Sequence, residues 1–174
     1  MKKLFRNILF MAIATAAYVA CSDVEEPYDL PGKGSNALVE PDSLGAGTAT
    51  DPFNCWAALK KGKQLANGES TTEEFYIKGK VVSIALDKTT KEPLNYNQGT
   101  FGNATFYISD DGTEKAQFYC YRLKYLKGAK WTSEAGPILY VGDNVIVKCK
   151  LYNYQGTIEN KDGSLYSLNG NTGN

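Results

Sequence analysis

The chain has 174 residues, enough for one domain of ordinary size and some additional segments. Twelve tyrosines, with many glycines and β-branched residues, favour a β-rich domain. Basic and acidic residues are equal at 19 each, and loss of the N-terminal Lys2, Lys3 and Arg6 leaves three acidic residues in excess. This balance argues against a strong nucleic-acid binder, and the lack of histidine excludes imidazole from catalysis and metal binding.

Residues 1–20 read as a signal peptide. The basic start is followed by an apolar stretch at 8–20, which is too short to span a bilayer, since a span needs about 20 residues. The stretch ends in Tyr18-Val19-Ala20-Cys21, and small residues before a cysteine resemble the lipobox of bacterial lipoproteins, although Tyr18 stands where leucine is usual. The resemblance implies cleavage before Cys21 and its lipidation. An ordinary secretory signal is the alternative.

Residues 21–49 read as a flexible tether, because they are rich in Gly, Pro, Ser and Asp and lack an apolar period. The acidic cluster within residues 22–26 resembles the surface-export signal of Bacteroidetes lipoproteins, with a plain solvated tether as the alternative. We therefore expect a protein held by lipid in the outer membrane of a cell envelope, with the membrane as one partner and the cell surface as one location.

A helix is expected at the start of the folded domain, which we place at residues 50–168. Asp51 can cap a helix, and Pro52 suits its first turn. An apolar stripe that includes Trp56 continues through Gln64 and predicts a short amphipathic helix that closes one end of a sheet. We expect Trp56 to pack in the core, with a ligand role as the alternative.

Five strands are expected, over residues 73–86, 103–109, 116–123, 140–154 and 157–168. Gly79 predicts a bend or bulge in the first. We expect a loop at 152–156, a last strand that is single or broken into a hairpin at Asp162-Gly163, and a disordered tail at 169–174. Alternation predicts that Ala104, Phe106, Ile108, Phe118, Cys120, Val145, Val147, Cys149 and Leu151 point inward, and that Thr105, Tyr107 and Ser109 point outward.

Five strands, a bent first strand and Gly142-Asp143 before the fourth resemble an OB-fold, the five-stranded Greek-key barrel. The runs GNATFYISDDG, QFYCYR, VGDNVIV and YSLNG are similar to an OB-like domain of Bacteroidetes lipoproteins, a family without an assigned function, and the similarity covers residues 48–170. The resemblance implies an all-β barrel with one short helix. An OB-fold normally has its helix between strands three and four, whereas the helix expected here precedes strand one.

The outward tyrosines of the second and third strands are the candidate ligand site. Tyr107, Tyr119 and Tyr121 would share the face that, in an OB-fold, forms a binding groove with the loops joining strands one to two and four to five. Those loops would add Tyr96, Tyr152, Tyr154 and Gln155. Such a platform could stack bases, at about 1–3 kcal/mol each, or sugar rings. Alternatively, the cross-strand tyrosine pairs only stabilise the sheet, at about 0.2–1 kcal/mol.

A second pattern is basic. Lys78 and Lys80 on the first strand and Lys148 and Lys150 on the fourth could form a patch for phosphate or acidic glycans, because these strands are neighbours in an OB barrel. Exposed lysines also protect strands from aggregation, and this is the alternative reading.

Cysteines and acidic residues suggest no cofactor or metal. Cys55, Cys120 and Cys149 are expected to be buried as small hydrophobic residues, with a disulfide as the alternative. The acidic stretch 110–114 lacks EF-hand spacing and reads as a hairpin turn. We therefore expect a non-catalytic module that binds an oligosaccharide or a single-stranded nucleic acid. A structural or accessory lipoprotein that docks onto an envelope protein is the alternative.

Overall fold

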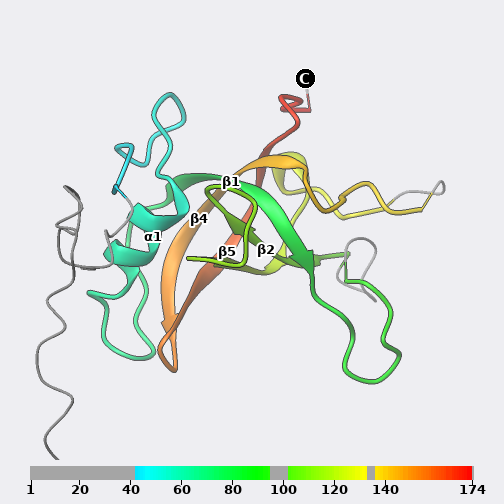
Figure 1. The fold of residues 1–174 in the computed structure, drawn as a ribbon, viewed down its shortest axis with the longest axis horizontal. Helices are drawn as coiled ribbons and strands as arrows, with labels where there is room; N and C mark the ends of the chain where they lie inside the picture. Colours follow the sequence, from blue (N-terminus) through cyan, green and yellow to red (C-terminus); the bar gives the residue numbers. More distant parts are fainter. Residues whose placement is uncertain (1–41, 95–101, 133–135, 174) are drawn as a thin grey trace, which may run out of the picture. The chain divides into compact units, whose positions relative to one another are not determined.

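A computed structural model describes residues 42–94, 102–132 and 136–173, which belong to one compact unit (Figure 1). Its elements are α1 (Cys55–Gly62), β1 (Phe75–Ile84), β2 (Ala104–Ser109), β3 (Phe118–Leu123), the 3-10 turn η2 (Leu126–Gly128), β4 (Asn144–Tyr154) and β5 (Thr157–Leu168). The strands close a barrel in the order β1-β2-β3-β5-β4, in which only the β3–β5 pair is parallel. The predicted all-β, OB-like barrel with one short helix preceding the first strand is confirmed.

The barrel interior contains the side chains that alternation placed there. All nine residues predicted to point inward are at most 2% exposed. Thr105 and Ser109, predicted to point outward, are also buried, because loop and bulge backbone covers them. Thr105 Oγ1 accepts a hydrogen bond from the Arg122 N–H, and Ser109 Oγ accepts one from the Gly112 N–H.

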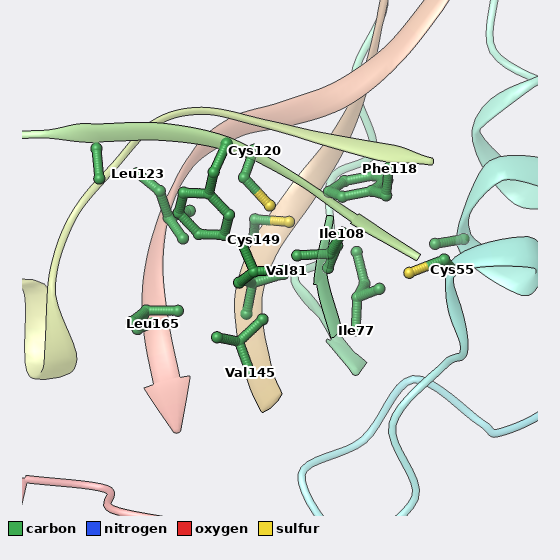
Figure 2. Packing of buried hydrophobic residues seen from close by; sticks show 14 of the residues in the cluster. Cys55, Ile77, Val81, Ile108, Phe118, Cys120, Leu123, Val145, Cys149 and Leu165 are labelled. Carbon is green, nitrogen blue, oxygen red and sulfur yellow. The ribbon is translucent and has the colours of Figure 1, made fainter. Parts of the chain in front are cut away.

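Helix α1 closes one end of the barrel and contacts all five strands. Figure 2 shows Cys55 of this helix beside the buried side chains of the barrel, such as Ile77 and Ile108. It begins later than predicted: Asn54 is the N-cap and accepts from the Ala57 N–H at 2.9 Å, whereas Asp51 accepts from the Ala46 N–H in the preceding loop. Cys55 is fully buried, while Trp56 is half-buried beneath Lys63 rather than part of the core. Within the described part of the chain, no helix is long and apolar enough to cross a bilayer.

The folded domain extends beyond both of its predicted ends. Residues 42–49 are not part of a free tether, because Asn54 Nδ2 donates to the Asp42 carbonyl and the Tyr76 N–H donates to the Gly47 carbonyl. Residues 169–173 are not disordered, because the Asn169 side chain accepts from the Asn144 N–H and donates to Asp143. The folded unit therefore includes both segments.

The bulges lie elsewhere than expected. Gly79 stays in regular register with Val145 of β4, and the register shift of β1 against β2 lies between Val81 and Ser83. Gly79 is small for another reason, since a Cβ atom there would lie 2.8 Å from Cys55 Sγ. β5 is one continuous strand with two register shifts against β4, one of which falls at the predicted break, Asp162-Gly163.

Candidate ligand-binding groove

A row of side chains crosses the outer face of four neighbouring strands. In the strand register Tyr107 of β2 faces Tyr119 of β3, Tyr119 faces Glu159 of β5, and Glu159 faces Tyr152 of β4. At about 4.8 Å per strand spacing the row is roughly 14 Å long. The predicted meeting of Tyr107 and Tyr119 is confirmed, and the two rings stack with centroids 4.6 Å apart.

Stacking limits what the inner tyrosines can offer a ligand. The planes of Tyr107 and Tyr119 differ by only 21°, so each covers a face of the other, and Tyr121 tilts against Tyr119 at 5.8 Å. Burial, together with the neighbouring tyrosines and Glu159, raises the pKa of Tyr119 to about 12. Tyr119 thus belongs to the supporting layer, and Tyr121, which is 38% exposed, is the accessible end of this group.

A β-bulge sets the direction of Tyr121. The β2–β3 register shifts between Ala104 and Phe106, and Arg122 adopts φ +49°, a conformation that non-glycine residues rarely occupy. Two side chains hold this backbone. Asn160, only 3% exposed, accepts from the Tyr121 N–H at 2.6 Å and donates to its carbonyl at 2.9 Å, and Thr105 accepts from Arg122. Fixed strained backbone of this kind often accompanies functional sites.

A groove of about 470 Å³ lies over β3, β5 and the adjoining part of β4. We call it the tyrosine groove; it is lined by Asn103, Tyr121, Arg122, Lys124, Tyr152, Glu159, Asn160, Lys161, Asp162 and Gly163. A second groove of about 560 Å³ lies between β3 and residues 85–94 and shares Asn103, Tyr121 and Arg122 with the first. The two hollows therefore meet at the bulge.

Cations lie against both outer tyrosines of the tyrosine groove. The Arg122 guanidinium is 5.0 Å from the ring centre of Tyr121, and Lys161 Nζ is 4.5 Å from that of Tyr152. Both basic side chains are exposed. The groove thus has two aromatic side chains that each carry a donor-bearing cation: Tyr121 with Arg122 on β3, and Tyr152 of β4 with Lys161 of β5.

The buried polar groups of the groove are acceptors. Glu159 is 7% exposed, and within the described residues no ion pair or hydrogen bond to its carboxylate is found. Burial raises its pKa. Asn103 Oδ1 is enclosed, and no hydrogen-bond partner for it is found among the residues that the structure describes. Such groups are costly to leave unpaired, so their presence in one groove is unusual for a purely structural surface.

The other predicted ligand residues lie in β4, in the β4–β5 turn and outside the described part of the chain. Tyr152 and Tyr154 lie within β4 rather than in a loop, because the β4–β5 hairpin turns tightly at Gln155-Gly156. Tyr154 is 50% exposed and lies 6.1 Å from Tyr152, so it extends the aromatic surface. Gln155 is in the turn, where its N–H donates to Asn67. Tyr96 lies outside the described residues.

The predicted basic patch is divided. Lys78 and Lys80 line a groove beside α1, whereas Lys148 lies in another groove, where it forms a 2.8 Å ion pair with Glu74. This pairing raises the pKa of Lys148. Lys150 faces Lys161 across the β4–β5 register and lines neither groove. Four ammonium groups do not gather at one site.

The cysteines and the acidic turn have structural positions. Cys55, Cys120 and Cys149 are buried free thiols, and desolvation raises the pKa of each. Asp110 accepts hydrogen bonds from the first N–H groups of α1, and Asp111 accepts from Thr113 in the hairpin turn. In the described ranges, no three potential metal-ligating side chains gather.

The sequence matches no protein-family model, and no curated protein is significantly similar to it. The function is therefore inferred from the geometry of the groove. Arg122, Glu159 and Asn160 were not among the predicted site residues, because their roles depend on the bulge and on the parallel β3–β5 contact, which pair residues far apart in the chain.

Proposed function

We propose that the domain is a non-catalytic binding module of the cell envelope whose tyrosine groove holds an oligosaccharide. The observation that carries the proposal is the bulge at Tyr121 and Arg122, fixed by Asn160, which places an exposed tyrosine beside Tyr152 and Glu159 in one groove. Aromatic rings can pack against the apolar faces of sugar rings. The surrounding amide, carboxylate and cationic groups can bond to sugar hydroxyls, which both donate and accept.

A single-stranded nucleic acid fits this groove less well. Base stacking could use Tyr121 and Tyr152. However, backbone phosphates that reach Arg122, Lys124 or Lys161 would also have to approach the Glu159 carboxylate. Lys78, Lys80 and Lys148 lie in other grooves. The small acidic excess of the processed chain also disfavours the binding of a nucleic acid.

Binding can be tested by calorimetric titration of the full chain in detergent with soluble glycans and with a short single-stranded oligonucleotide. We expect saturable, salt-insensitive binding of a glycan, weakened about tenfold or more by Tyr121→Ala or Tyr152→Ala, on the assumption that ring contacts contribute as base stacking does, about 1–3 kcal/mol. Tyr166→Ala is the matched control, because Tyr166 is 37% exposed and lines a different groove. Salt-sensitive oligonucleotide binding lost in Tyr121→Ala would instead establish the nucleic-acid function. Glycan turnover abolished by Glu159→Gln would show an enzyme.

Attachment through lipid on Cys21 is part of the proposal, and its support is the sequence pattern of residues 1–21. The experiment is fractionation of cells that express the wild-type chain or the Cys21→Ser variant. We expect the variant to lose incorporation of labelled fatty acid and to leave the membrane fraction. Unchanged incorporation would contradict lipidation at Cys21.

Docking onto an envelope protein is the second candidate, and one observation favours it. Tyr140 and Val141 are adjacent before β4 and are 59% and 64% exposed. If this function holds, a crosslinked envelope partner should be lost in Val141→Ser and retained in Tyr121→Ala. The opposite pattern would assign the contact to the tyrosine groove.

A further inference from the structure

The acceptor at the bottom of the tyrosine groove specifies its ligand further than the aromatic rings do. Glu159 faces Tyr119 on one side and Tyr152 on the other, so neighbouring rings cover much of it while it lines the groove. A ligand that lies in the groove is therefore met from below by a carboxylate, which accepts hydrogen bonds.

The charged groups around Glu159 do not neutralise it. Arg122 and Lys161 lie over the rings of Tyr121 and Tyr152, and neither forms an ion pair with the carboxylate. Asp162 also lines the groove, from an exposed position. Arg122 and Lys161 are thus at the exposed rim, Lys124 lines the groove from a partly buried position, and the least accessible charge is that of Glu159.

We propose that Glu159 selects a neutral sugar unit, whose hydroxyl groups donate to the Glu159 carboxylate while its remaining oxygens accept from the cations that line the groove. This inference rests on the proposed glycan function and adds the ligand class. A hydroxyl group matches both layers, because it carries one donor and two acceptor positions. A uronate or a phosphate offers only acceptors at its charged group and would place it near a buried carboxylate.

Matched ligands separate these possibilities. Galactose oligomers and galacturonate oligomers differ by a carboxylate on each ring, and glucose oligomers and glucosamine oligomers differ by an amine. The full chain in detergent would be titrated with all four by calorimetry, as would Glu159→Gln and the control Glu74→Gln. Glu74 is a suitable control because it pairs with Lys148 in another part of the barrel. Thermal unfolding of each variant verifies that it is folded.

The expected result is that a neutral oligomer binds more tightly than its uronate counterpart. Glu159→Gln should weaken that binding about tenfold, because a hydrogen bond to a charged acceptor is stronger than one to an amide. Glu74→Gln should have no effect.

Three results would overturn the inference. Tighter binding of the uronate oligomer, or selective binding of the glucosamine oligomer alone, would refute the neutral-sugar class while leaving glycan binding intact. Neutral-sugar binding that is unchanged in Glu159→Gln would remove the selecting role of that residue. Failure of the wild-type chain to bind any of the four would refute this sugar class, and failure with the whole glycan panel would refute the glycan function as well.

Discussion

The carboxylate of Asp110, at the end of β2, accepts a hydrogen bond of 2.5 Å from the backbone N–H of Cys55, the first residue of α1. Its second oxygen accepts from the Trp56 N–H at 3.3 Å. A negative charge at a helix N-terminus is favourable, because the first N–H groups lack partners within the helix. Asp110 therefore joins the β2–β3 turn to the helix that closes the barrel.

Loss of this link should reduce stability. We expect Asp110→Ala to lower the free energy of unfolding by about 1–2 kcal/mol, as does the loss of a helix cap elsewhere. Urea denaturation would measure this change, with Glu114→Ala as the control, because Glu114 is exposed on the same turn.

Added calcium should leave the wild-type urea midpoint unchanged. A rise in the midpoint that Asp110→Ala abolishes would contradict a purely structural role for this carboxylate.

The close approach of Gly79 to α1 gives a second prediction. A Cβ atom at position 79 would lie 2.8 Å from Cys55 Sγ and 3.1 Å from the Ile108 side chain. Gly79→Ala should therefore destabilise the domain by about 1–3 kcal/mol, the usual cost of overpacking a core.

A double-mutant cycle can assign that cost to the sulfur atom. Cys55→Ala removes it, so Gly79→Ala should cost less in the Cys55→Ala background than in the wild type. Equal costs in both backgrounds would place the strain at Ile108 and the Ser109 carbonyl oxygen, which both lie 3.1 Å from the added Cβ atom.

Sequence patterns predicted the barrel well because each inward residue follows a period of two that needs only local information. The same rule could not find the groove. Tyr121 obeys the alternation, but its direction is set by a bulge that Thr105 and Asn160 stabilise from other strands. Glu159 lies on an ordinary outer-face position, and only the parallel contact with β3 places it beside Tyr119.

The errors at the helix have a similarly local cause. Asp51-Pro52 has the composition of a helix start, yet Asp51 closes the preceding loop and Asn54 caps the helix, because Asp42, Leu44 and Gly47 pack back onto this region. The prediction that residues 42–49 are a tether left out the hydrogen-bond partners of Asp51 and Asn54. Without those partners the helix start at Asn54 could not be predicted.

Substitutions of the stacked Tyr119 and of the exposed Tyr121 should have different effects on stability and on ligand binding. Tyr119→Ala should lower the free energy of unfolding by about 0.5–1.5 kcal/mol or more, because it removes the stack with Tyr107. Tyr121→Ala should change stability by less, because its side chain is exposed, while it weakens ligand binding. Equal losses of stability in the two variants would show that Tyr121 is also structural.

The thiols give a prediction that distinguishes free cysteines from a disulfide. Cys55, Cys120 and Cys149 are buried, and their raised pKa values keep them protonated and unreactive. In native protein they should resist a thiol-specific reagent, and all three should react after denaturation. A reductant should not change the melting temperature; a lower melting temperature with reductant would reveal a disulfide.

Glu159 should make the unliganded domain less stable as the pH rises. Burial raises the pKa of this carboxyl in the folded state above its unfolded value, so the folded state binds a proton more tightly. Between the two pKa values stability therefore falls with increasing pH, and the loss is complete above the folded pKa. Among the surrounding groups, Tyr119 stays uncharged over this range because its pKa is about 12.

The measurement is the difference in unfolding free energy between Glu159→Gln and wild type at several pH values between about 4 and 8. We expect the variant to be the more stable protein at neutral pH and its advantage to disappear as the pH falls below the unfolded pKa of about 4.3. Asp111 has a lowered pKa through hydrogen bonds from Thr113, so its contribution to stability is lost in acid, but this occurs in both proteins and cancels in the difference. A variant that is less stable at neutral pH would mean that the Glu159 carboxylate has a stabilising partner, and the groove would then lack the unpaired acceptor that a bound hydroxyl group is proposed to satisfy.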